Sequence, residues 1–260
     1  MINCVLGVDI GTTSLKVGLF TEKGEVVSLI VELFHNPDSS FIANEWLPSL
    51  KNSIKKIKKE IDFSLYKLIA ISVSGNGPTV VSENGRTFIW NENLPDDLII
   101  PESCKNSLFL PRILSFKKLY PKEYEESSRI YSSYEFLIYK LTGNSFTIMP
   151  EKRFIMAYWN EQQLKDCGIL EDKMPPYKEI AQLCGNVSSE VNEYLGIKEA
   201  DLPVFSAGSD FVAAMIGTNT LEKGKLCERS GSSEGFNFCI DKTIFSENAR
   251  TLPSVISGLW

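Results

Sequence analysis

Histidine is almost absent from this sequence, and its scarcity excludes several kinds of site. The single histidine, His35, precedes the loop-like stretch Asn-Pro-Asp-Ser-Ser, so we expect it on the surface. One histidine excludes a histidine-rich metal site and disfavours histidine-based catalysis. The six cysteines contain no Cys-x-x-Cys pair, and a chain of 260 residues needs no disulfide framework. Reduced thiols are therefore expected.

The chain also lacks an excess of basic charge and any long apolar run. Its net charge of −6 disfavours nucleic acid as a partner, because phosphate backbones are bound by basic surfaces. No apolar run approaches the length of a membrane span, and the first residues show neither the basic region nor the cleavage site of a signal peptide. We therefore expect a cytoplasmic globular protein that binds neither nucleic acid nor membrane.

The two commonest phosphate-binding fingerprints, G-x-G-x-x-G and G-x-x-x-x-G-K-[ST], are missing too. Instead, the stretch GVDIGTTSLKVGLF near the N-terminus places an aspartate and a turn of small, hydroxylated residues between two apolar segments. Gly11 permits a tight turn, and Thr12 and Thr13 add hydrogen-bond donors for an anion. Asp9 could hold Mg²⁺ through water, and Lys16 could reach a phosphate oxygen. The alternative is a hairpin without a ligand.

Hydrophobic patterning predicts an α/β chain. Residues 3–9, 14–21 and 25–34 are predicted as strands joined by tight turns in an antiparallel meander. Apolar residues at helical spacing predict a helix over 44–62, with its lysines on a solvated face. A near-continuous apolar run over 66–78 then predicts a buried strand that enters a loop.

The second half of the chain continues this pattern after a helical insertion. A hairpin is predicted around Asn84-Gly85, and residues 94–146 are predicted to be mainly helical and irregular, with a helix that ends at Gly143. Residues 202–219 predict a strand, a loop and a helix, and residues 224–241 a second hairpin with a glycine-serine turn. The expected architecture is a mixed sheet flanked by helices.

Two of these later segments carry candidate chemistry. Asp210 lies in a glycine- and serine-rich loop at a strand end, where α/β folds bind ligands. It could act as a general base toward a substrate hydroxyl in phosphoryl transfer, or it could merely cap the following helix. The stretch SGSSEG, residues 230–235, could be a second phosphate loop or a plain hairpin turn. The combination of all three motifs suits a two-domain phosphotransferase.

Taken together and in this order, the motifs resemble the FGGY carbohydrate kinases of the sugar kinase/Hsp70/actin superfamily. GVDIGTTSLKVGLF is similar to the family's first phosphate motif, and RSGSSEGFNF resembles the second. ISVSGNGPTVV resembles the Ser-Gly-Gln strand and loop, the helix ending in Leu-Thr-Gly matches another family segment, and LPVFSAGSDFVAAMIG resembles the catalytic Gly-x-x-Asp motif. These matches cover nearly the whole chain.

The resemblance implies an ATP-dependent sugar kinase with an actin-like ATPase (ribonuclease H-like) fold. It implies that Asp210 is the catalytic base, that Asp9 organises Mg²⁺, and that domain closure excludes water. Further residues are implied as ligands: Thr12, Thr13, Lys16, Gly231, Ser232 and Ser233 for the ATP phosphates, and Asn76, Gly77, Asp210 and Phe211 for the sugar. The implied substrate is a sugar or polyol, with a pentulose such as xylulose as the best single choice. A homodimer is compatible with the resemblance.

Departures from the family pattern fall mostly on the sugar side. Phe211 stands where the family usually has Asn or Gln, and Gly77-Pro78 where many pentulose kinases have Met-His. The usual Trp-x-Asp-x-Arg becomes Trp90-Asn-Glu-Asn-Leu, without the arginine, and the usual Thr-Asp becomes Thr147-Ile148. The stretches that mark glycerol kinases are not seen. These departures keep two alternatives open: a sugar-binding or regulatory homologue without turnover, and an actin- or Hsp70-type ATPase.

Family members are much longer than this chain. We therefore expect residues 1–219 to form the sugar-binding N-terminal domain with the first phosphate motif. Residues 220–260 would be the truncated start of a second, nucleotide-binding domain of the same fold. Such a piece should carry the sugar side and the aspartates but bind ATP poorly.

Overall fold

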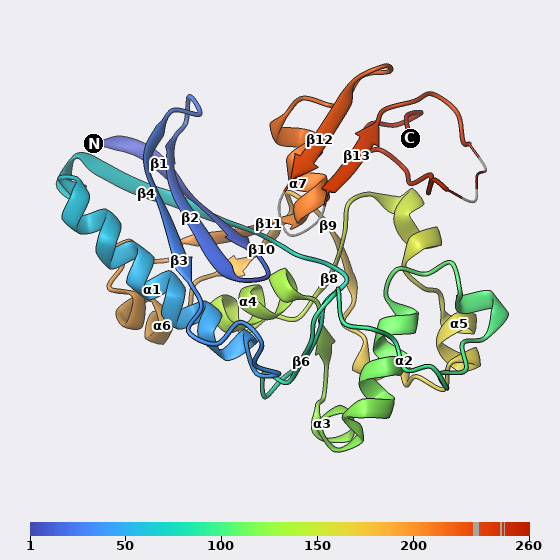
Figure 1. Ribbon diagram of the computed structural model, residues 1–260. Helices are drawn as coiled ribbons and strands as arrows, with labels where there is room; N and C mark the ends of the chain where they lie inside the picture. Colours follow the sequence, from blue (N-terminus) through green and yellow to red (C-terminus); the bar gives the residue numbers. More distant parts are fainter. Residues whose placement is uncertain (231–233, 245, 247) are drawn as a thin grey trace.

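A mixed β-sheet forms the centre of the protein. The computed structural model describes residues 1–230, 234–244, 246 and 248–260 (Figure 1). Its main sheet has six strands in the order β3-β2-β1-β4-β11-β10. Their bounds are β1 Ile2–Ile10, β2 Ser14–Thr21, β3 Val26–Leu33, β4 Tyr66–Gly75, β10 Leu183–Asn186 and β11 Pro203–Ser209. The predicted mixed sheet flanked by helices is confirmed.

The first three strands form the predicted antiparallel meander. β1 pairs with β2 and β2 with β3, both antiparallel, whereas β1 pairs parallel with β4 and β4 parallel with β11. Alternate residues of β1, namely Cys4, Leu6, Val8 and Ile10, are buried, as expected for a strand with one face on the core. β10, which the sequence patterning did not predict, adds an antiparallel edge strand beside β11.

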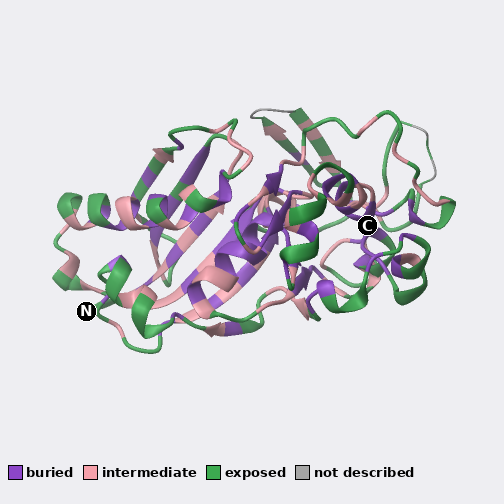
Figure 2. Ribbon diagram, turned by 90° about the horizontal axis from the view of Figure 1, so that it is seen from below, coloured by how far each residue is buried: buried purple, intermediate pink, exposed green. Residues whose placement is uncertain are grey.

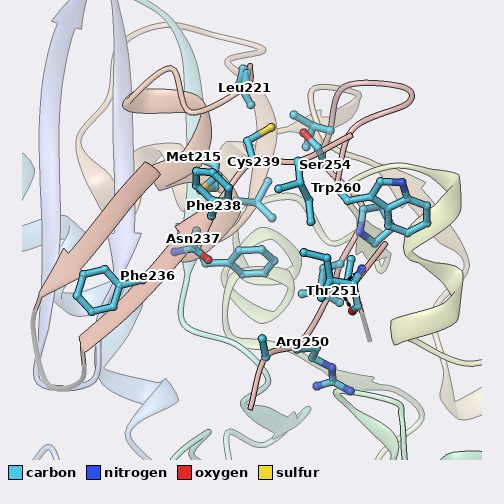
Figure 3. A pocket seen from close by; sticks show the side chains of 18 of the residues that line it. Met215, Leu221, Phe236, Asn237, Phe238, Cys239, Arg250, Thr251, Ser254 and Trp260 are labelled. Atoms are coloured by element: carbon cyan, nitrogen blue, oxygen red, sulfur yellow. Dashed lines mark hydrogen bonds between the residues drawn. The ribbon is translucent and has the colours of Figure 1, made fainter. Parts of the chain in front are cut away.

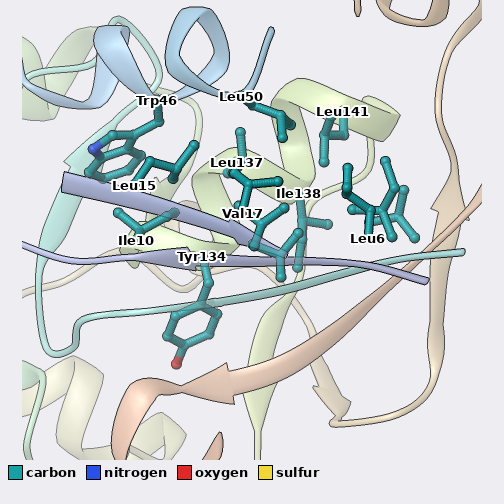
Figure 4. Close-up of a cluster of buried hydrophobic side chains, with 14 of the residues drawn as sticks. Leu6, Ile10, Leu15, Val17, Trp46, Leu50, Tyr134, Leu137, Ile138 and Leu141 are labelled. Carbon is teal, nitrogen blue, oxygen red and sulfur yellow. The ribbon is translucent and has the colours of Figure 1, made fainter. Parts of the chain in front are cut away.

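Helices cover one face of this sheet. α1 (Ala43–Glu60) packs on β2 and β3, α4 (Ser133–Thr142) packs on β4, β10 and β11, and α6 (Ser189–Leu195) lies against α1. Figure 4 shows the core between them, with Trp46 and Leu50 of α1 facing Leu15 and Val17 of β2 and Leu137 of α4. The buried positions run along the strands and the inward sides of these helices (Figure 2).

A second body of short elements surrounds another apolar cluster. It contains the predicted hairpin at Asn84-Gly85, formed by β5 (Val80–Ser82) and β6 (Thr87–Phe88), with Gly85 at φ +88°. The other elements of this body are η2 Glu102–Cys104, α2 Leu110–Leu119, α3 Pro121–Glu126, β7 Ile130–Tyr131, β8 Thr147–Met149, η3 Lys152–Ala157, α5 Glu161–Asp166, η4 Glu171–Lys173 and β9 Tyr177–Glu179. The short helix η1 Phe63–Leu65 belongs to the main sheet instead, where it precedes β4. This body forms one wall of the cavity described below.

The last segment leaves the main sheet through α7 (Asp210–Gly217). It then forms a two-stranded antiparallel sheet of β12 (Leu226–Ser230) and β13 (Glu234–Phe238), which lies beside α7 (Figure 1). Within the described residues, this hairpin pairs with no strand of the main sheet. Helices long and apolar enough to cross a membrane do not occur in the described part of the chain.

Candidate active site

Three parallel strands end side by side and bring the predicted motifs together. Asp9 of β1 pairs with Ser74 of β4, and Ser74 pairs with Gly208 of β11. The turn after β1, the loop after β4 and Asp210 after β11 therefore leave the sheet at the same edge. Ligands of open α/β sheets bind at the carboxyl ends of parallel strands, so this edge is the expected place for a site.

The turn after β1 is held tightly, and a side chain in place of its glycine would be crowded. The backbone N–H of Gly11 donates to the carbonyl of Ser14 at 2.9 Å. A Cβ at Gly11 would lie 3.0 Å from that carbonyl oxygen and 3.3 Å from Lys16 Nζ. Lys16 Nζ in turn lies 3.3 Å from Asp9 Oδ2, and both side chains are nearly half exposed. Such a solvated ion pair is weak, so both groups remain available to a ligand.

The two threonines of this turn line a small cavity that does not contain Asp210. Trp90 Nε1 donates to Thr12 Oγ1 at 3.1 Å, so Thr12 keeps its own hydroxyl proton for another acceptor. Thr12 and Thr13 line a cavity of about 290 Å³ together with Asn91 and Glu92. The structure therefore separates these threonines from the cavity that contains Asp210. Their role toward ATP stays a prediction.

The loop after β4 forms part of the wall of the cavity that contains Asp210. Asn76 is buried, its N–H donates to the carbonyl of Ile10 at 2.8 Å, and its Oδ1 accepts from Thr79 Oγ1 at 2.8 Å. Ser133 of α4 donates to the carbonyl of Asn76. These bonds fix the loop and leave Gly77, which is joined to Pro78 by a cis peptide bond, against the cavity.

Asp210 is the first residue of α7 and is half-buried in the same cavity. Its Oδ1 accepts the backbone N–H of Phe211 at 2.7 Å, so the carboxylate satisfies one free donor at the helix start. The capping alternative therefore holds in part, although Ser209 occupies the N-cap position itself. Burial raises the pKa of Asp210, and the negative charge of Asp9 raises it further. A raised pKa suits a general base.

The cavity in front of Asp210, hereafter the Asp210 cavity, has a volume of about 460 Å³. Its apolar wall includes Phe109, Tyr158 and Phe154, whose ring centroid lies 6.5 Å from that of Phe211. Apolar walls with a few polar groups are typical of small-molecule sites. The structure thus brings Asn76, Gly77, Asp210 and Phe211 together in one cavity, and their role toward a sugar stays a prediction.

Further polar groups of the Asp210 cavity come from residues that the sequence patterning did not single out. Arg229 of β12, Asn237 of β13 and Arg250 all line the Asp210 cavity. The positive charge of Arg229 acts to lower the pKa of Asp210. Arg229 and Asn237 both lie in RSGSSEGFNF, the stretch that resembles the second phosphate motif, and this position was the available signal.

A second cavity of about 320 Å³ adjoins the first, behind Phe211. Figure 3 shows Met215 of α7 close to Phe238 of β13, with Trp260 on the opposite side. Phe154, Phe211 and Asn237 line both cavities. The two cavities are therefore neighbours that share part of their walls.

The acidic groups fit Mg²⁺ bound together with a phosphorylated ligand. The described residues contain no group of three or more His, Cys, Asp or Glu side chains that could hold a metal alone. Mg²⁺ commonly uses one or two carboxylates and completes its shell with water and substrate phosphates. Asp9 and Asp210 are carboxylates of this kind, and the negative charge of Asp9 acts on Asp210. Their role toward Mg²⁺ stays a prediction. The predicted residues Gly231, Ser232 and Ser233 lie outside the described residues.

Comparisons with known proteins agree with this fold. No known family profile matches the chain. It is 22% identical over 98% of its length to the xylulose kinase of Escherichia coli (strain K12), covering 58% of that protein. It is 26% identical over 96% of its length to the gluconokinase of Bacillus subtilis (strain 168), covering 54%.

A solved structure shows the same architecture. The crystal structure of xylulose kinase from Rhodospirillum rubrum matches with a TM-score of 0.80 and 16% identity, over 98% of this chain and 59% of that one. The chain therefore spans little more than half the length of the relatives it matches. In sequence the chain resembles the xylulose kinases and gluconokinases of the FGGY carbohydrate kinase family, and its fold is their actin-like ATPase fold.

Proposed function

We propose that this chain is part of an ATP-dependent carbohydrate kinase, which transfers the γ-phosphate of ATP to a hydroxyl of a sugar or polyol. The observation that carries the proposal is the position of Asp210. Its carboxylate is half-buried at the ends of three parallel strands, in a cavity sized for a small molecule, with a raised pKa. The names of the relatives, xylulose kinase and gluconokinase, support the same reaction.

Each residue of the site has a proposed task. Asp210 would accept the proton of the substrate hydroxyl while that oxygen forms a bond to the γ-phosphorus and the bond to the leaving ADP oxygen breaks. Asp9 would hold Mg²⁺, which when bound would screen the charge of the ATP phosphates. Lys16 would contact a phosphate oxygen, as would Thr12 and Thr13. Phosphoryl transfer requires chiefly such positioning and charge compensation.

The sugar would lie in the Asp210 cavity, on the loop that carries Asn76 and Gly77. Phe211 would pack against the carbon skeleton, since the usual amide is replaced by an aromatic ring. A pentulose such as xylulose is the first substrate to test, because several curated relatives are named xylulose kinase. The role of each residue toward the sugar is part of this proposal.

The domain arrangement proposed from the sequence also remains a proposal. Residues 1–219 would form the sugar-binding domain, and residues 220–260 would begin the nucleotide-binding one. The separate β12–β13 sheet is compatible with this division, because within the described residues it pairs with no strand of the main sheet. The residues Gly231, Ser232 and Ser233, proposed to bind ATP phosphates, belong to this second part.

The test is ADP release by the longest natural reading frame that contains this chain. Mg-ATP would be supplied with a panel of ketoses, aldoses, aldonates and polyols, with xylulose first. Asp210→Asn should lower kcat by about 10²- to 10⁴-fold, the range expected for a lost general base. Asp172→Asn is the matched control, because Asp172 is exposed in η4 and lies outside the site.

The outcomes separate the candidate functions. Turnover of one panel member that is lost in Asp210→Asn and retained in Asp172→Asn would support the kinase and identify its substrate. Sugar binding without ADP release would favour a binding or regulatory protein, which the presence of Phe211 motivates. ATP hydrolysis that needs no sugar would favour an actin- or Hsp70-type ATPase.

A further inference from the structure

Two cysteines that are far apart in the sequence meet in the second body of the protein. Cys104 lies in η2, and Cys167 directly follows α5, 63 residues further along the chain. Their Sγ atoms are 2.9 Å apart, and both are free thiols. A disulfide bond is about 2.05 Å long, so the two sulfur atoms need to approach by only about 1 Å to form one.

Contacts on both sides of the thiols hold them in this arrangement. The elements η2 and α5 pack against each other. Ser103 Oγ donates to Asp166 Oδ2 at 2.6 Å, and Gln163 Nε2 donates to the carbonyl of Ser103 at 2.6 Å. Cys104 Sγ also lies 3.5 Å from the carbonyl oxygen of Gln163. The side chain of Cys104 is therefore directed at α5, where the second sulfur lies.

The two thiols differ in their access to solvent. Cys104 is fully buried, whereas Cys167 is 8% exposed, so an oxidant reaches Cys167 first. Burial raises the pKa of the Cys167 thiol to about 12, the neighbouring Cys104 and Asp166 raise it further, and Lys117 opposes them. Because the thiolate is the reactive form of cysteine, such a pair stays reduced under mild conditions and reacts slowly with an oxidant.

We propose that Cys104 and Cys167 are a redox modification site, which a peroxide converts into a reversible disulfide. The peroxide oxidises the Cys167 thiol to a sulfenic acid and is itself reduced to water. The Cys104 sulfur then bonds to the Cys167 sulfur while the bond from that sulfur to its oxygen breaks. The oxygen leaves as a second water with the proton of the Cys104 thiol. A small thiol reductant reverses the reaction by thiol–disulfide exchange.

The disulfide would join two segments that continue into the wall of the Asp210 cavity. Leu108, which follows η2, and Tyr158, which precedes α5, both line this cavity. The N–H of Leu108 already donates to the carbonyl of Ala157 at 2.7 Å, so the segments are in contact without the bond. A disulfide between elements that are already packed restricts chiefly the unfolded chain. The oxidised protein should therefore resist unfolding better than the reduced one.

The bond is tested by peptide mapping of the longest natural reading frame. The folded protein is treated with hydrogen peroxide, its remaining thiols are alkylated in denaturant, and trypsin releases peptides 87–105 and 166–173, each with one cysteine. Mass spectrometry should find these two peptides joined, and dithiothreitol should separate them. Cys104→Ala and Cys167→Ala should each abolish the joined species. Cys184→Ala is the matched control, because Cys184 is equally buried but its Sγ lies against the carbonyl of Gln182.

Urea unfolding measures the consequence of the bond. The midpoint of the oxidised wild type should lie roughly 1 M above that of the reduced protein, and this difference should vanish in Cys104→Ala but persist in Cys184→Ala. The inference would be overturned if either cysteine joined a different partner, if the bond formed only in unfolded protein, or if oxidation left the midpoint unchanged. The map of the wild type decides the pairing even where an alanine variant does not fold, and it requires no turnover.

Discussion

Glu135 should make the stability of this protein fall as the pH rises from 5 to 8. It lies in the first turn of α4, is 4% exposed, and its two carboxylate oxygens accept the backbone N–H groups of Ser132 at 2.8 Å and Ile148 at 2.6 Å. Burial nevertheless dominates and raises its pKa from 4.5 to about 7. At a pH between these two pKa values, Glu135 holds its proton in the folded state but has released it in the unfolded state.

The size of the effect follows from this shift. Because the folded protein binds more protons in this window, its free energy of unfolding decreases as the pH rises, and it levels off above 7. For a pKa of 4.5 unfolded and about 7 folded, the loss between pH 5 and pH 8 is about 2.5 kcal/mol. Glu135→Gln removes the ionisable group and with it this loss.

Glu135→Gln also lowers the free energy of unfolding by an amount that is the same at every pH. A glutamine offers one acceptor oxygen and one NH₂, so one of the two backbone N–H groups would face a donor, at about 1–3 kcal/mol. That cost does not depend on pH. The difference in unfolding free energy between Glu135→Gln and wild type should therefore shift by about 2.5 kcal/mol in favour of the variant from pH 5 to pH 8.

Urea unfolding at pH 5, 6, 7 and 8 measures this difference directly, because other titrating groups are common to both proteins. Glu193→Gln, the same substitution at an exposed position of α6, is the control and should run parallel to wild type. If Glu135→Gln also runs parallel to wild type within about 0.5 kcal/mol, the resolution of such unfolding data, the reasoning is refuted.

Two further predictions concern the sheet edge. Gly75→Ala should lower the free energy of unfolding by about 1–3 kcal/mol, because its Cβ would lie 2.7 Å from Ser133 Oγ and 3.0 Å from Ile10 Cβ. Gly217→Ala, with nothing within 4 Å, should be neutral or slightly stabilising, and urea unfolding compares the two. Asp9→Asn should raise the Mg²⁺ concentration needed for half-maximal ADP release by about tenfold, since a carboxylate ligand is lost, without changing the melting temperature. An unchanged Mg²⁺ requirement would remove Asp9 from the metal site.

The sequence predicted the local structure near the N-terminus well. Alternating apolar residues and tight turns gave the strands β1 to β3, and helical spacing gave α1 almost to its ends. These elements are encoded by periodicities within a few residues, so they are visible without the fold. The sequence patterning did not predict β10, because it is a four-residue edge strand without a clear alternation of apolar and polar residues.

The candidate site was predicted in its parts rather than in its arrangement. Asp9, Asn76 and Asp210 stand out because each follows or ends an apolar strand in a stretch of small residues. Thr12 and Thr13 line a cavity separate from that of Asp210, and Thr12 accepts a hydrogen bond there from Trp90, a contact across 78 residues of sequence. No local pattern contains such a contact.

What the sequence determined by itself is therefore the identity of the strands, the turn chemistry and the resemblance to sugar kinases. Only the tertiary structure decided which groups lie together. The parallel pairing of β1, β4 and β11 places Asp9 and Asp210 at one sheet edge, and the fold brings Arg229 and Asn237 of the hairpin into the lining of the same cavity as Asp210. The burial that raises the pKa of Glu135 likewise exists only after packing. Periodicity and turn preference act over a few residues, whereas charge, desolvation and unmet hydrogen bonds depend on neighbours that the fold brings from far along the chain.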